Sequence, residues 1–182
     1  MKNFCSFPTF GIYSFEDASK LVSNIDLSSV AFKVKHTYGT EDLILNQDIQ
    51  FYRQFLTLSM IGDGTPIAVT EGVDLIWHNH ILDTSKYIMD CHNLFGGYFH
   101  HFPYFGLRSE SDYENLVEAS KTTNDLYKQY FQISPFELTT GSLCNGGSEC
   151  GKGCAKCVQS QDSPSSNPYL DVLNQPRPVY SL

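Results

Sequence analysis

Five of the six histidines in the chain lie within one stretch of 24 residues that also contains a cysteine. The set is His78, His80, Cys91, His92, His100 and His101. Imidazole nitrogens and thiolate sulfurs are ligands that zinc, copper and iron accept. The segment 77–101 is therefore the candidate functional site, and the expected cofactor is a transition-metal ion, which is iron, copper or zinc.

The spacing of apolar residues predicts one continuous helix over 73–95, ended by Gly96 and Gly97. This helix is apolar on most of its circumference, so it belongs at the centre of the domain. Its buried face carries His80, Thr84, Tyr87 and Cys91, whereas His78 points about 160° away from His80 on a regular helix. The two histidines are therefore not expected to share an ion.

The Gly96-Gly97 turn lets the following residues fold back towards Cys91. The candidate metal ligands of this core are His78, His80, Cys91, His100 and His101. The candidate catalytic residues are Tyr87, as a proton donor or a radical-capable neighbour, and Thr84. One site that uses part of this set and two separate sites both remain open, since about 16 Å of helix separates His80 from Cys91.

A plainer interpretation also applies to each of these residues. A buried histidine more often satisfies a hydrogen bond in the core than binds a metal, and a single cysteine usually behaves as a small apolar side chain. His92 is expected to be solvated, and three acidic residues are expected at the surface: Asp74, Asp83 and Asp90.

Four further cysteines crowd a short stretch near the C-terminus, namely Cys144, Cys150, Cys154 and Cys157. From residue 141 onward Gly, Ser, Asn, Gln and Pro dominate and no apolar period persists. Residues 1–140 are therefore expected to form the helical domain, and residues 141–182 a flexible tail. Four thiolates suit zinc, and copper(I) binding or a redox pair fits the tail equally well.

The remaining elements follow from caps and apolar periods. A Ser14–Asp17 capping box predicts a helix to about Asn24, and Thr40-Glu41-Asp42 predicts another up to Gly62. A fourth helix is expected from Ser109 or Ser111 through the region of residue 130. Residues 28–38 alternate enough to suggest one short strand. The predicted fold class is all-α, a compact bundle of about four main helices.

Composition restricts the candidate partners. Hydrophobic residues make up 41% of the 182 residues, which suffices for one packed domain, and the formal net charge is −8. That charge disfavours nucleic acid and anionic membranes as partners, and no apolar run is long enough to span a bilayer. The first residues lack the continuous apolar run of a signal peptide, so a reducing, cytoplasmic compartment is expected.

The central motif resembles the glycine-rich domain-containing protein-like family of plants and bacteria, over roughly residues 41–131. The matching positions are Trp77, His78, His80, Thr84, Tyr87, Cys91, Phe95, Gly96, Phe99, His100, His101 and Pro103. The extra Gly97 departs from the family's pattern, and many bacterial relatives replace the second histidine of the pair, here His80. Many relatives also carry a tail rich in Gly and Cys. The resemblance implies a site but no defined reaction.

Three functions remain candidates. The first is a metal-dependent oxidoreductase that acts on a peptide or a small molecule, which requires an open coordination position beside a pocket. The second is a non-catalytic metal-binding module with a structural or metal-delivery role, which requires a closed four-ligand site. The third is a helical interaction domain without a metal, whose histidines are satisfied in the core.

Overall fold

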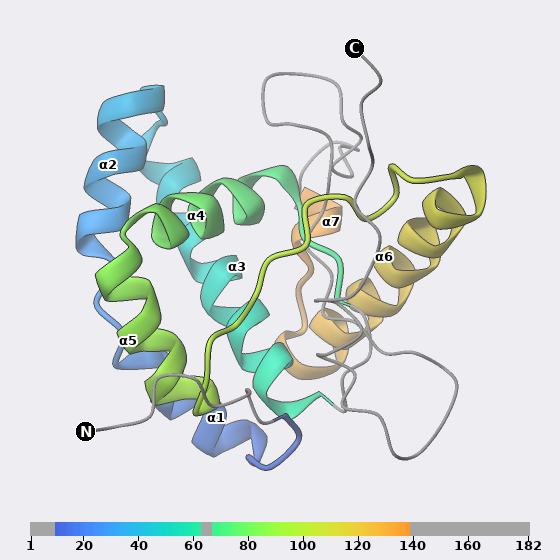
Figure 1. The fold of residues 1–182 in the computed structure, drawn as a ribbon, viewed down its shortest axis with the longest axis horizontal. Coiled ribbons are helices and arrows are strands. Elements are labelled where there is room, and N and C mark those ends of the chain that lie inside the picture. Colours follow the sequence, from blue (N-terminus) through green and yellow to red (C-terminus); the bar gives the residue numbers. More distant parts are fainter. Residues whose placement is uncertain (1–9, 63–66, 139–182) are drawn as a thin grey trace. The chain divides into compact units, whose positions relative to one another are not determined.

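The computed structural model describes residues 10–62 and 67–138. These residues form seven helices and no β-strand, so the predicted all-α fold is confirmed (Figure 1). The helices are α1 (Phe15–Ser23), α2 (Ser28–Tyr38), α3 (Asp42–Ile61), α4 (Glu71–Leu82), α5 (Thr84–Phe95), α6 (Glu110–Phe131) and α7 (Pro135–Leu138). They divide between two compact units, which are described separately below.

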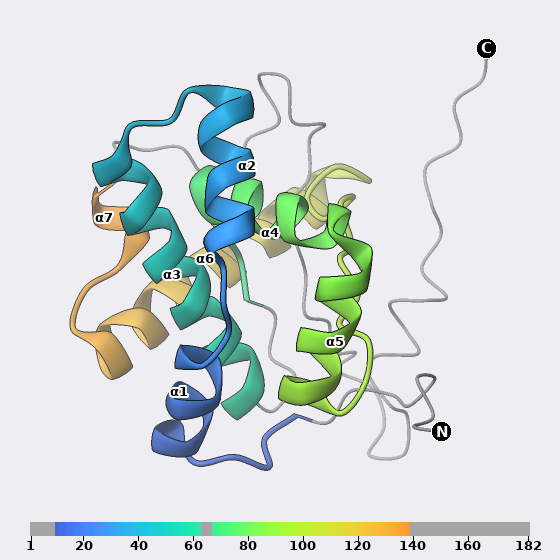
Figure 2. The ribbon, with the colours of Figure 1, turned by 90° about the vertical axis from the view of Figure 1, so that its left-hand side faces the viewer.

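The first unit contains α1 to α5, in the described residues 10–62 and Thr70–His100. Helix α3 packs against α1, α2 and α4, and α4 also packs against α2 and α5. Figure 2 shows α2 beside α3 and in front of α4, and α2 contacts both helices. Helices α3 and α4 are therefore the frame on which the rest of the unit is built.

Several helix ends lie where the local sequence predicts them. The Ser14 hydroxyl accepts a hydrogen bond from the backbone amide of Asp17 at 3.1 Å and caps α1. Helix α3 ends at Gly62, and the Ser109 hydroxyl caps α6 by accepting from the amide of Asp112 at 3.1 Å. A short polar side chain at such a position satisfies one of the amides that a helix start leaves without a partner.

The strand predicted for residues 28–38 is wrong, because this segment forms helix α2. Val30 and Val34, one helical turn apart, are its buried residues, and Gly39 ends it in the left-handed conformation at φ 67°. A single strand would have left its backbone amides and carbonyls without sheet partners, whereas a helix satisfies them internally. The apparent alternation depended on Phe32 between the two valines, and Phe32 is exposed.

The continuous helix predicted over 73–95 is also wrong. Asp83, at φ −85° and ψ 71°, separates α4 from α5, and the chain changes direction there (Figure 1). In one straight helix, Trp77 and Tyr87 would lie about 15 Å apart along the axis. Instead the Trp77 Nε1–H donates to the Tyr87 hydroxyl oxygen at 2.8 Å. The break is therefore accompanied by contacts between α4 and α5 that a straight helix could not make.

An aromatic core fills the first unit. Trp77 stacks on Phe99 with ring centres 5.1 Å apart, and Phe55 lies 4.7 Å from Trp77. Phe95 stacks on Phe99 at 4.6 Å, and the Tyr87 hydroxyl donates to the Phe99 carbonyl oxygen. All five side chains are almost completely buried. The Gly96 turn, at φ 70°, returns residues 98–100 to this core, as the sequence predicts.

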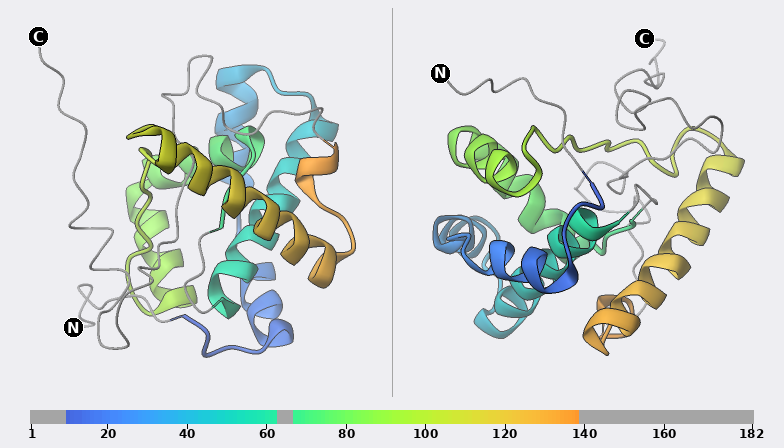
Figure 3. Two further views of the ribbon diagram at one scale, coloured as in Figure 1. Left: turned by 90° about the vertical axis from the view of Figure 1, so that its right-hand side faces the viewer. Right: turned by 90° about the horizontal axis from the view of Figure 1, so that it is seen from below.

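The second unit contains α6 and α7 with residues 67–69 and 101–138 of the described chain. Figure 3 shows α6 along its length. Its apolar cluster consists of Ala68, Phe102, Phe105, Leu116 and Ala119. The buried Asp112 carboxylate accepts from the Gly106 amide at 2.7 Å and from Arg108, which fixes the loop that precedes α6.

Replacing Tyr87 by Phe should lower the free energy of unfolding by about 2–4 kcal/mol. The substitution removes the acceptor of the Trp77 indole and the donor to the Phe99 carbonyl, and each buried group then bears a cost of about 1–3 kcal/mol. Urea unfolding followed by far-UV circular dichroism measures the change. Tyr38→Phe, at an exposed tyrosine, is the matched control and should change stability by less than about 0.5 kcal/mol. Equal effects of the two variants would contradict this interpretation.

Candidate metal centre

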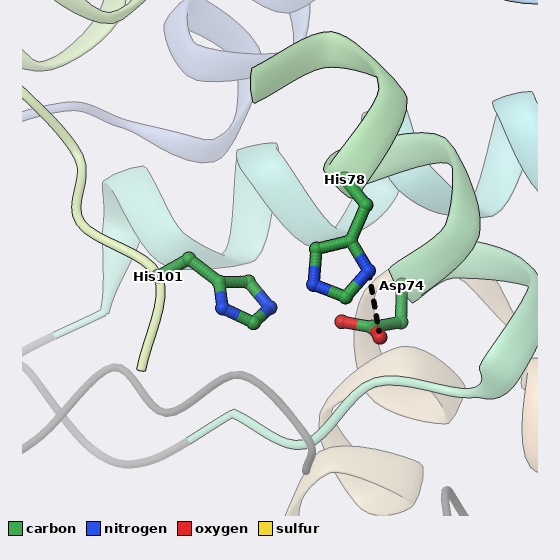
Figure 4. Close-up of side chains that lie close together, drawn as sticks. All are labelled: Asp74, His78 and His101. Atoms are coloured by element: carbon green, nitrogen blue, oxygen red, sulfur yellow. Dashed lines mark ion pairs between the residues drawn. The ribbon is translucent and has the colours of Figure 1, made fainter. Parts of the chain in front are cut away.

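Asp74 and His78 lie one turn apart on α4, and their side chains face each other (Figure 4). His78 Nδ1 is 3.4 Å from Asp74 Oδ2. Only 3% of the Asp74 side chain is exposed, whereas 32% of the His78 side chain is exposed. The Asp74 carboxylate is therefore buried in the first unit, and the neighbouring His78 imidazole is partly exposed to solvent.

This pair joins two donor types that divalent transition metals accept, a carboxylate oxygen and an imidazole nitrogen. Residues four apart on a helix project from the same face with their Cβ atoms about 5–6 Å apart, which suits a shared ion. Among the described residues of the first unit, no further His, Cys, Asp or Glu joins these two in a three-ligand group. An ion at this position would need ligands beyond Asp74 and His78.

His80 lies on another side of α4 and is engaged in the core. Its Nδ1 is 2.9 Å from the Tyr52 hydroxyl, and its Nε2 is 2.9 Å from Asp90 Oδ2. Both bonds are satisfied when Tyr52 donates to Nδ1 and the Nε2–H donates to the carboxylate. No ring nitrogen then remains for an ion, which matches the plainer interpretation of a core histidine.

Asp90 completes this network at the edge of the core. Its Oδ2 accepts from Lys86 Nζ at 2.8 Å as well as from His80. Burial acts to raise the pKa of Asp90, but the hydrogen bonds from His80 and Lys86 outweigh it and hold the pKa below its usual value. Asp90 was expected at the surface, and it instead joins α5 to α4.

The two candidate catalytic residues occupy different environments. Tyr87 is 1% exposed, and its hydroxyl is engaged with Trp77 and Phe99. Burial raises the pKa of Tyr87 well above its ordinary value, so the hydroxyl holds its proton firmly. Thr84 is exposed at the first position of α5. The structure does not bring these two residues together with Asp74 and His78.

Cys91 is buried beside Tyr87 and the returning segment. Burial raises the pKa of its thiol to about 12 and outweighs the opposing hydrogen bonds from the Phe99 backbone and the Tyr87 side chain. A metal binds the thiolate rather than the thiol, so Cys91 would have to lose its proton against this burial. The predicted role of Cys91 as a ligand receives no support from its surroundings.

The two histidines after the glycine turn fall in different units. His100 ends the first unit, lies 4.6 Å from the Tyr98 ring, and has a pKa lowered by burial. A lowered pKa favours the neutral imidazole, which is the form that binds metals. His101, also drawn in Figure 4, is the first residue of the second unit and is half-buried. The four tail cysteines, Cys144, Cys150, Cys154 and Cys157, lie outside the described residues.

Sequence reasoning overlooked Asp74, which was expected at the surface and is only 2% exposed. The signal was present as the four-residue spacing from Asp74 to His78, which places two ligand types on one helical face. His92, expected to be solvated, is half-buried, and Asp83 marks the break between α4 and α5. The surface position predicted for Asp74 and for Asp90 is therefore wrong in both cases.

A family model described as UCP032817-like matches residues 19–124, more than half of the chain. The protein therefore belongs to the UCP032817-like family. No curated protein and no solved structure is similar enough to match the chain. Among residues 10–62 and 67–138, no helix combines the length and apolar character needed to cross a bilayer.

The family match corrects the resemblance drawn from the sequence. The glycine-rich domain-containing protein-like family is the wrong assignment, because the model that matches is UCP032817-like. The matched region, residues 19–124, includes the whole segment between Trp77 and Pro103. The four tail cysteines lie beyond the matched region.

Replacing Asp90 by Asn should lower stability at pH 7 by about 1–2 kcal/mol, because the ion pair with Lys86 is lost. A carboxylate with a lowered folded-state pKa stabilises the fold above its unfolded pKa of about 3.9, and this contribution disappears as the pH falls through the folded-state value. The variant should therefore lose less stability than the wild type between pH 6 and pH 3.

Urea unfolding across this pH range measures the effect. Asp42→Asn is the matched control, because Asp42 also pairs with a lysine, Lys35, but both side chains are exposed. Such a surface pair contributes only about 0–1 kcal/mol. If the free energy of unfolding changed with pH in the same way in the wild type and in Asp90→Asn, the hydrogen bonds of His80 and Lys86 with residue 90 would not depend on the charge of Asp90.

Proposed function

We propose that this protein binds a divalent transition-metal ion through Asp74 and His78 on α4. The observation that supports this proposal is the buried Asp74 carboxylate, 3.4 Å from a partly exposed imidazole on the next turn of the helix. Removing a carboxylate from water is costly, and a cation at this position would offset that cost. The exposed part of His78 provides access from solvent.

The two donors restrict the kind of metal. An oxygen and a nitrogen donor suit borderline ions such as Zn²⁺, Co²⁺, Ni²⁺ and Fe²⁺, whereas copper(I) favours thiolates. Zinc needs about four ligands, so two more must come from other side chains or water. The candidate from the sequence within the first unit is His100. Neutral His100, with its pKa lowered by burial, is in the required form.

The proposed role is metal binding of a structural or metal-delivery kind rather than a reaction. Tyr87, the candidate proton donor, is buried with its hydroxyl engaged in two hydrogen bonds. Tyr87 is therefore not available as the proton donor of the oxidoreductase hypothesis, and that hypothesis, with its peptide or small-molecule substrate, stays a prediction from the sequence. Binding of metal by the tail cysteines and a cytoplasmic location remain predictions from the sequence.

A protein-interaction domain is the second candidate, and exposed apolar residues favour it. Phe32 on α2 is 72% exposed and Leu43 at the start of α3 is 80% exposed. Large apolar side chains exposed at a surface are available for contact with another protein. The two candidates differ in one property, since an interaction domain without a metal would bind no ion at Asp74 and His78.

The full chain, purified without a histidine tag and with its four tail cysteines replaced by serine, should bind about one Zn²⁺ or Co²⁺ per molecule. Isothermal titration calorimetry with Zn²⁺ and the visible absorption of bound Co²⁺ measure this binding. His78→Ala and Asp74→Asn should each weaken it at least tenfold, since each removes one donor. His100→Ala should weaken binding more than His92→Ala.

His36→Ala is the matched control, because His36 is an exposed histidine on α2 and should leave the affinity unchanged. Circular dichroism of each metal-free variant separates a lost ligand from a lost fold. Absence of bound metal in the serine background, or equal affinity in His78→Ala and His36→Ala, would contradict the proposal.

A further inference from the structure

The start of α4 is in unusually close contact with α3. The Asp48 carboxyl group on α3 lies against the Cα of Gly72, the second residue of α4. A Cβ atom built on Gly72 would lie 2.3 Å from Asp48 Oδ1 and 2.6 Å from Oδ2. Any other residue at position 72 would therefore displace the carboxyl group, so glycine is what permits this approach.

Hydrogen bonds do not fix this contact in the part of the chain that the structure describes. Asp48 has no hydrogen bond or ion pair with another described residue. Thr70, at the N-cap of α4, makes no side-chain cap, and its buried Oγ1 has no hydrogen-bond partner within residues 10–62 and 67–138. The first turn of α4 is thus held to α3 mainly by packing, with a carboxyl group at its centre.

The surroundings of Asp48 disfavour the ionised form of its carboxyl group. A helix start stabilises a nearby anion by about 0.3–1 kcal/mol, which alone would lower the pKa of Asp48. Burial acts in the opposite direction and raises the pKa of Asp48 to about 6, because the carboxylate loses solvation there. No charged group of the surrounding helices contributes to this shift, including Lys20 on α1, Lys35 on α2, Arg53 on α3, and Glu71 and Asp74 on α4.

We propose that Asp48 and Gly72 form a proton-dependent contact that holds the first turn of α4 on α3 at acidic pH and releases it towards neutral pH. The neutral carboxylic acid packs against Gly72, whereas the carboxylate moves towards water because burial leaves it incompletely solvated in place. Asp74 belongs to the same first turn, and its amide donates to the Thr70 carbonyl oxygen at 2.9 Å. Release of this turn therefore increases the freedom of the Asp74 side chain.

The sign of the pH effect follows from the two states of the chain. In the unfolded chain Asp48 loses its proton near pH 4, while in the fold it keeps the proton to about pH 6. Stability conferred by the contact is therefore complete below pH 4 and is lost as the pH rises to about 6. Asp48→Asn, which stays neutral at every pH, should retain the contact throughout.

Hydrogen exchange of the amides of residues 74–77 tests the proposal, because these amides donate to carbonyls in the first turn of α4. Protection factors, corrected for the intrinsic effect of pH on exchange, should fall about tenfold in the wild type between pH 5 and pH 7.5. The expected fall is smaller than the roughly 100-fold limit that a pKa raised from near 4 to about 6 would allow, because Asp48 is partly exposed. Asp48→Asn should show no fall.

Gly72→Ala is the second variant, since its Cβ displaces the carboxyl group and should also abolish the pH dependence. Glu114→Gln, at an exposed residue on α6, is the control and should keep the wild-type profile. Identical pH profiles in the wild type and Asp48→Asn, or a fall of equal size in amides of α6, would overturn the proposal.

The consequence for ion binding rests on the proposed function of Asp74 and His78. If that function holds, the Zn²⁺ affinity of Asp48→Asn should differ from that of the wild type at pH 7.5 and approach it at pH 5.5. Hydrogen exchange is measured without metal, so the two proposals fail separately. Absence of Zn²⁺ binding would contradict only the proposed function. Protection of residues 74–77 that does not change with pH would contradict only the proposed Asp48 contact.

Discussion

The hydrogen bond from the Trp77 indole to the Tyr87 hydroxyl is the interaction on which the first unit depends. The same hydroxyl donates to the Phe99 carbonyl, so one oxygen atom connects α4, α5 and the segment that returns after the Gly96 turn. All three side chains are buried, and each group would be costly to leave without its bond. The break at Asp83 is what allows these bonds to form together.

This connection also determines which groups of α4 face which surroundings. With Trp77 fixed in the aromatic core, His80 points towards Tyr52 and Asp90 and becomes a structural histidine. His78, two residues earlier, points elsewhere and meets Asp74 instead. A single helix therefore supplies one histidine to the core and another to a partly exposed pair with a carboxylate. Function is proposed for the second of these because only there does a ring remain accessible.

The sequence was informative where a signal is local. Ser14 and Ser109 as caps and Gly62 and Gly96 as helix ends could all be predicted, because each depends on chemistry within a few residues. The return of the chain after Gly96 followed from the same kind of reasoning. These signals were enough to predict an all-α fold and a compact region around Trp77.

The remaining features depend on partners that are distant in the chain. Nothing between residues 73 and 95 is Gly or Pro, so only the contacts with Tyr87 and Asp90 explain the break at Asp83. Helix α2 likewise becomes evident only when Val30 and Val34 are seen to be buried. Burial of Asp74 is a third case, since its charge favours the surface unless the fold encloses it.

X-ray absorption at the zinc K edge most directly tests the claim that α4 presents Asp74 and His78 to a metal. The sample is the full chain with its four tail cysteines replaced by serine, loaded with one equivalent of Zn²⁺. We expect a first shell of nitrogen and oxygen atoms at about 2.0–2.1 Å, with imidazole scattering that diminishes in His78→Ala. A sulfur shell at about 2.3 Å, or an unchanged spectrum in His78→Ala, would contradict this claim.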